Sequence, residues 1–120
     1  MEARAPAEDR SLPKSRRLLS RRDFLRARAR GRKAHTQHLI ALWTPPRTGS
    51  GRVGLTVSTK VGNAVVRNRV KRWLREIYRQ ERDALPAPVD LVLIAKTGAG
   101  DAGYHALRAE FLEIARRIAS

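Results

Sequence analysis

The stretch VGNAVVRNRVKRWLREIYR, residues 61–79, combines a helical pattern of apolar residues with a large excess of positive charge. Apolar side chains recur at spacings of three and four residues, which predicts an amphipathic helix. Asn63 is a suitable N-cap, and Pro86 and Pro88 favour an end near Leu85. The predicted core stripe of this helix consists of Val66, Val70, Trp73, Leu74 and Ile77.

The opposite side of the predicted helix is almost purely cationic. Like charges one helical turn apart cost about 0.2–0.5 kcal/mol per pair. Solvated charged faces usually mix the two signs, so this pattern indicates that a phosphate backbone supplies the missing negative charge. The residues of this side are Arg67, Asn68, Lys71, Arg72, Arg75, Arg79 and Arg82, with Arg69 at its flank.

The composition of the whole chain agrees with a polyanionic partner. The 120 residues include 26 Lys and Arg against 11 Asp and Glu, which gives a formal charge of +15. A charge of this size is typical of nucleic-acid-binding proteins. The absence of cysteine excludes disulfides and thiolate metal sites, and it fits a cytoplasmic protein. The longest apolar runs, such as residues 91–95, are too short to span a membrane.

The remaining patterns predict a single α+β domain. Residues 1–13, rich in Ala, Pro and charge, are expected to form a disordered tail, and residues 14–120 a single RNA-binding domain. A helix is expected over 20–30, capped by Ser20, with Leu19, Phe24 and Leu25 as its apolar contacts. Further along the chain we expect strands at 38–44, 52–58 and 90–95, the last one central and buried, a glycine-rich loop at 98–103 and a helix at 104–119.

The acidic and histidine residues do not form a catalytic pattern. A metal-dependent nuclease needs clustered carboxylates or histidines to hold its ions, whereas the acids here are scattered. Glu110 and Glu113 share a helix face and are expected to pair with Arg117 and its neighbours. His35, His38 and His105 lack ligand or triad spacing and are interpreted as ordinary surface or turn residues. We therefore expect the protein alone not to cut RNA.

The segment GLTVSTKVGNAVVRNRVKRWLREIYR, residues 54–79, resembles the signature of the bacterial ribonuclease P protein component family. Its central feature is Arg-Asn-Arg at 67–69, followed by VKR at 70–72. The resemblance extends to RRDF at 21–24 and DLVLIA at 90–95. It implies a two-layer α/β sandwich of order α-β-β-β-α-β-α, with an additional short strand at 32–35 and a left-handed β-α-β crossover.

The resemblance also implies a function. The family enzyme is a ribonucleoprotein that removes the 5′ leader of precursor tRNA. Its RNA subunit carries the active site and binds the catalytic Mg²⁺, while the protein binds that RNA and holds the leader in a cleft between the sheet and the first helix. We accordingly expect a cytoplasmic protein that is monomeric outside the complex.

Particular residues follow from the matched motif. The resemblance implies contact with the catalytic RNA for Arg67, Asn68, Arg69, Lys71 and Arg72, extended by Arg75 and Arg79, with Lys60 on a phosphate. Phe24 matches an aromatic that meets the leader, although it fits equally well as a core contact of the first helix. Arg28 stands where a second cleft aromatic is common, and Thr59 replaces a Lys. The resemblance therefore implies weaker stacking and stronger Coulombic attraction in the leader cleft.

Two other classes share some of these features. A small ribosomal or rRNA-binding protein would carry the same basic helix, but it would not need a leader cleft. A cationic membrane-surface protein would need the apolar face of that helix to meet lipid, and here the core requires that face.

Overall fold

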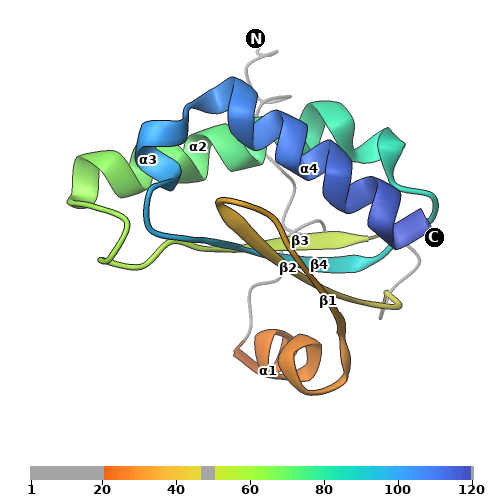
Figure 1. The fold of residues 1–120 in the computed structure, drawn as a ribbon. Coiled ribbons are helices and arrows are strands. Elements are labelled where there is room, and N and C mark those ends of the chain that lie inside the picture. Colours follow the sequence, from red (N-terminus) through yellow and green to blue (C-terminus); the bar gives the residue numbers. More distant parts are fainter. Residues whose placement is uncertain (1–20, 47–50, 120) are drawn as a thin grey trace, which may run out of the picture.

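The computed structural model describes residues 21–46 and 51–119, which form one sheet with helices on both of its faces (Figure 1). The expected tail at 1–13, Leu19 and the cap at Ser20 lie outside the described residues. The strands are β1 (Arg32–His35), β2 (Leu39–Thr44), β3 (Arg52–Thr56) and β4 (Asp90–Ala95). Their order in the sheet is β1-β2-β4-β3, so β4 occupies the interior position predicted for it.

The helices divide between the two faces of the sheet. In Figure 1, α2 and α4 cover one face together with α3, and α1 lies against the other. Their bounds are α1 (Arg21–Arg30), α2 (Ala64–Glu81), the 3-10 turn η3 (Arg82–Ala84), α3 (Ala99–Ala102) and α4 (Tyr104–Ala119). The predicted order is confirmed, including the strand at 32–35. The segment expected as a loop at 98–103 contains the one-turn helix α3, which begins after Gly98 at a φ of 97°.

The pairing of the strands explains how the chain returns to the sheet. β1 with β2 and β2 with β4 are antiparallel, whereas β3 and β4 are parallel neighbours. Parallel neighbours cannot be joined by a hairpin, so α2 serves as the crossover between them. The left-handed sense of this crossover stays a prediction.

The main core lies between the sheet and the layer of α2 and α4. From α2, the predicted stripe contributes Val70, Leu74 and Ile77, all fully buried, while Val66 and Trp73 are partly buried at its edge. Tyr78, which lies outside the predicted core stripe, is also buried. Its ring meets that of Phe111 on α4 edge to face, with centroids 6.4 Å apart. This geometry is favourable for aromatic pairs and joins the two long helices.

The two ends of α2 follow from local chemistry. The Asn63 side chain accepts a hydrogen bond from the backbone N–H of Val66 at 3.0 Å, so the predicted N-cap is confirmed. The α-helix ends at Glu81, earlier than the predicted Leu85, because the chain tightens into η3. Leu85 is then extended, as expected for a residue that precedes proline.

Candidate nucleic-acid interface

The predicted basic face of α2 points away from the sheet. Because Val70, Leu74 and Ile77 pack inward, the residues on the other side of the helix face outward. Asn68, Arg69, Arg72 and Arg75 are exposed, and Arg67 and Lys71 are partly exposed. Within the parts of the chain that the structure describes, no carboxylate oxygen lies within 4.0 Å, the limit for an ion pair, of the charged nitrogens of Arg69, Lys71, Arg72 or Arg75. The structure therefore brings together an uncompensated cationic surface.

The C-terminal part of this face is different. The guanidinium of Arg79 forms an ion pair with Glu76 at 2.6 Å, and the same carboxylate accepts a hydrogen bond from Gln80. The positive charge of Arg79 is thus partly neutralised by its own helix. The free positive potential is concentrated between Arg67 and Arg75, nearer the start of α2.

The start of α2 adds to this potential. A helix N-terminus carries partial positive charge, and proteins usually place an acid in the first turn to balance it. The first turn of α2 contains no acid. Arg67 closes the preceding turn by donating from Nε to the carbonyl of Gly62 at 3.2 Å. Lys60 is exposed in that turn, so the first part of the face and the turn before it attract anions together.

The other predicted surface lies on α1. Phe24 is partly buried and packs against a small apolar cluster formed by Ala27, Leu42 and Val92. Arg28, one turn later, is exposed. Leu25, expected as an apolar contact of this helix, is 46% exposed. That expectation is wrong because Asp23 and Ala27, not Leu25, occupy the side of α1 that faces the sheet.

The face of the sheet that carries α1 also has partly exposed side chains that α1 does not fully cover. Residues paired across neighbouring strands point to the same face, and Leu42 and Val92 contact α1. Ile40 and Ile94 lie two positions from Leu42 and Val92 along their strands, so they point to the same face. Thr56 pairs with Ile94 and shares that face. All three side chains are partly exposed, so they extend the surface that begins at Phe24. The sequence pattern did not identify Ile40 and Ile94, because β2 and β4 are apolar on both faces.

An ionic cluster, which the sequence did not predict, lies where α1 meets the sheet. Arg52, the first residue of β3, contacts Asp90 at 2.8 Å and Asp23 at 3.1 Å. Asp23 and Asp90 are 7% and 2% exposed. The hydrogen bond to Asp90 raises the pKa of Arg52; desolvation opposes this effect, and the hydrogen bond to Asp23 reinforces it. In the sequence, Arg52 and Asp90 each stand at the start of a predicted strand, but the parallel pairing that brings them together is seen only in the structure.

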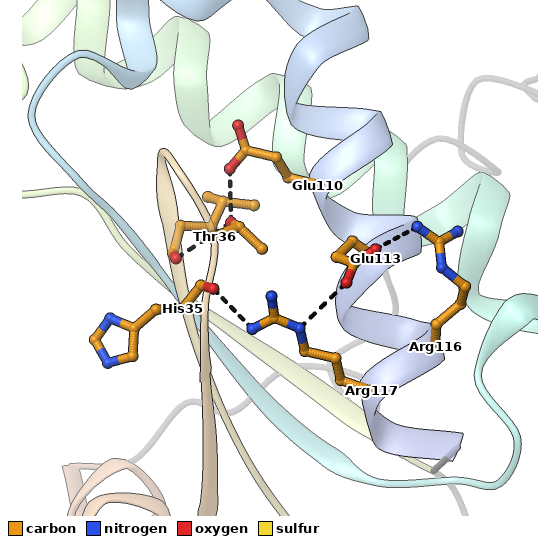
Figure 2. Close-up of polar contacts among 7 residues, drawn as sticks. His35, Thr36, Glu110, Glu113, Arg116 and Arg117 are labelled. Carbon is orange, nitrogen blue, oxygen red and sulfur yellow. Dashed lines mark hydrogen bonds and ion pairs between the residues drawn. The ribbon is translucent and has the colours of Figure 1, made fainter.

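Glu110 and Glu113 have different partners, although they share a helix. Glu113 pairs with Arg116 and Arg117, as predicted (Figure 2). Glu110 does not pair with arginine; it accepts hydrogen bonds from Thr36 Oγ1 and from the backbone N–H of His38, at 2.6 and 2.7 Å. His38 Nδ1 lies 2.6 Å from the same carboxylate. The prediction for Glu110 is therefore wrong, and His38 is part of a contact between the β1–β2 turn and α4.

Replacing Glu110 with Gln is expected to destabilise the fold at neutral pH by roughly 1–3 kcal/mol, since hydrogen bonds to a charged group contribute about that much. Burial alone would raise the pKa of Glu110, but the hydrogen bonds from Thr36 and His38 outweigh it and lower the pKa below the usual 4.5. The stabilisation is thus complete above pH 4.5 and is lost as the pH falls through the lower folded value.

Thermal melts of the parent and the Glu110→Gln variant at pH 7 and pH 3 measure this effect. The difference in melting temperature should be large at pH 7 and shrink at pH 3. Glu113→Gln is the matched control and should change little, because exposed ion pairs contribute little. An equal difference at both pH values would contradict the assigned role of the carboxylate.

The described residues offer no protein metal centre. Within residues 21–46 and 51–119, no group of three His, Cys, Asp or Glu side chains is arranged to hold an ion. His35 and His105 are exposed, as predicted. In the same ranges, none of the helices has the length and apolar character needed to cross a bilayer.

Comparison with known proteins identifies close relatives. A family model described as Ribonuclease P matches residues 12–119. The Ribonuclease P protein component of Desulfovibrio desulfuricans is 46% identical over 113 residues, covering 90% of this chain and 86% of that protein. Among solved structures, the RNase P protein of Thermotoga maritima superposes with a TM-score of 0.77 at 30% identity, covering 85% and 99% of the two chains. A mutant RNase P protein of Staphylococcus aureus gives 0.78 at 28% identity, covering 88% and 89%.

Proposed function

The chain belongs to the ribonuclease P protein component family, and on this premise we propose that it binds the catalytic RNA subunit through α2 and the 5′ leader of precursor tRNA through the α1 side of the sheet. Membership makes it a protein subunit of a tRNA-processing ribonuclease. The comparisons give no support to the alternative of a small ribosomal or rRNA-binding protein.

The observation that carries this proposal is the uncompensated charge of α2. Arg69, Lys71, Arg72 and Arg75 project from one helix without a carboxylate partner among the described residues. Such a face costs stability in the free protein and gains it when phosphates approach. The matched motif adds Arg67 and Asn68 at the start of the same face, with Lys60 before it. Arg79 contributes less to binding, because Glu76 holds its guanidinium.

The proposed leader site lies on the opposite face of the sheet (Figure 1). Single-stranded RNA binds where aromatic or apolar groups meet its bases and cations meet its phosphates. Phe24, Ile94 and Ile40 offer partly exposed apolar surface on this face, and Arg28 is exposed on α1 next to it. Since α2 and this site lie on opposite sides of the sheet, one small protein can contact both the catalytic RNA and the substrate.

Catalysis in this proposal belongs to the RNA. The described residues provide no carboxylate or histidine cluster for a metal ion, so we assign the catalytic Mg²⁺ to the RNA subunit. The protein contributes positive charge, which reduces repulsion between the phosphates of the enzyme and those of the substrate. We propose that it works in the cytoplasm and is monomeric outside the complex.

The experiment is reconstitution with a bacterial ribonuclease P RNA and a precursor tRNA. Nuclease-free protein alone is expected to leave the precursor uncut at any Mg²⁺ concentration. With the RNA subunit, the protein is expected to lower the Mg²⁺ needed for cleavage, because its cations replace part of the screening that metal provides. RNA-free protein that cuts at the mature 5′ end would contradict the proposal, and so would an unchanged Mg²⁺ requirement.

A further inference from the structure

The contact between α1 and the sheet contains little apolar surface. Among the residues that the structure describes, the buried apolar ones in it are Ala27, Leu42 and Val92, with Phe24 and Ile94 at its edge. Apolar contacts are not directional, and a residue as small as Ala27 does little to prevent a helix from rotating about its own axis. Another interaction is therefore needed to fix the orientation of α1.

The ionic cluster provides that direction. The guanidinium of Arg52 bridges Asp23 of α1 and Asp90 of β4, with Nη1 on the first carboxylate and Nε and Nη2 on the second. Bidentate pairs between arginine and carboxylate restrict geometry strongly. Arg26, the next turn of α1, has Nη1 3.9 Å from Asp90. Both carboxylates are buried, so loss of either contact leaves a charge without its full complement.

The other end of α1 is fixed by close backbone contact. Gly31 follows α1 directly, and its N–H donates to the carbonyl of Ala27 at 2.8 Å. A Cβ at Gly31 would lie 2.3 Å from that oxygen and 2.9 Å from the carbonyl of Trp43. The C-terminal end of α1 is thus pressed against β2. The ionic cluster holds the other end, near Asp23.

Asp23 immediately precedes Phe24, and Arg28 follows Phe24 by one turn. The rotation that directs Asp23 toward Arg52 therefore also decides where Phe24 and Arg28 point. We propose that the cluster of Asp23, Arg52 and Asp90 acts as a positioning device, which orients α1 so that Phe24 and Arg28 receive the leader. This inference rests on the proposed leader site, and it adds Asp23 and Arg52 as positioning residues for substrate binding.

Two variants weaken the device in different ways. Asp23→Asn removes the charge but keeps the shape of the side chain. Arg52→Lys keeps the charge but loses the planar fork that reaches both carboxylates. In the reconstituted holoenzyme, tRNA with a leader should bind more tightly than tRNA without one. Each variant is expected to reduce this preference about tenfold, which is similar to the affinity lost when one base no longer stacks. Affinity for the RNA subunit should stay unchanged, because α2 lies on the other face.

A spectroscopic measurement separates positioning from general loss of structure. The chain has two phenylalanines, Phe24 and Phe111, so ¹⁹F-labelled phenylalanine gives one probe beside the cluster and one in the main core. In both variants the Phe24 signal is expected to shift or broaden without any RNA present, while the Phe111 signal stays in place. The control is Glu113→Gln, which removes an ion-paired carboxylate from α4 and should move neither signal.

The outcomes are distinguishable. If Phe24→Ala preserves the leader preference, the proposed leader site is wrong. If Phe24→Ala loses the preference but Asp23→Asn and Arg52→Lys keep it, the positioning role is wrong. A Phe111 signal that moves together with the Phe24 signal would show that the cluster supports the whole fold, and it would overturn the inference as well.

Discussion

Replacing Lys71 and Arg75 with Gln is expected to weaken binding of the catalytic RNA by roughly 30-fold at about 0.15 M salt. Each phosphate contact contributes about 0.9 to the slope of log affinity against log salt concentration, and this estimate assumes that two contacts are lost. The slope should therefore become shallower by up to about two. Both side chains lie on the outer face of α2 without a carboxylate partner among the described residues, so the substitutions break no ion pair there. A salt titration of both proteins against the RNA subunit measures the change.

The matched control removes the same charge from elsewhere. Arg108 and Arg116 already have carboxylate partners, Glu81 and Glu113, so Arg108→Gln with Arg116→Gln should leave the salt slope almost unchanged. In low salt the Lys71 and Arg75 double variant should melt at or above the temperature of the parent, because like charges one turn apart have been removed. If it melts well below the parent, those side chains support the fold, and the assigned role of this face is wrong.

The two faces of α2 were readable from the sequence because helical periodicity separates them. Val70, Leu74 and Ile77 repeat with the spacing that packs against a sheet, and the structure buries all three completely. The charged residues could then be placed on the exposed side, because the residues that pack against the sheet determine which residues lie on the opposite side of the helix. A short range of sequence was sufficient because every contact that defines an α-helix is local.

Contacts between distant segments were not predictable in the same way. Asp23, Arg52 and Asp90 meet only because α1 packs on β2 and β4 beside the start of β3, and no local pattern encodes that packing. Glu110 was assigned to arginines on its own helix, whereas the β1–β2 turn brings Thr36 and His38 to it. In both places a buried or half-buried charged side chain binds a partner that is distant in sequence, and local spacing cannot reveal such a partner.

Replacing Phe111 with Ala is expected to destabilise the protein by about 3–5 kcal/mol, a large part of the roughly 5–15 kcal/mol that holds a typical domain together. Phe111 is fully buried in the main core, and its ring packs edge to face with that of Tyr78 on α2. Chemical denaturation of the free protein measures the loss. Leu112→Ala, at the next position on α4 and only partly buried, is the control and should cost much less.

The same variant distinguishes support of the fold from contact with RNA. If RNA binds only the folded protein, RNA at about 100 times its dissociation constant should restore about 2.7 kcal/mol of stability to Phe111→Ala. Its apparent affinity should fall only by the fraction that is unfolded, and its salt slope should match that of the parent, since every cation of α2 is retained. The Lys71 and Arg75 double variant should do the reverse, keeping its stability and losing slope. A shallower slope in Phe111→Ala would mean that α4 shapes the basic face of α2 directly, and the two faces of that helix could then no longer be treated as independent.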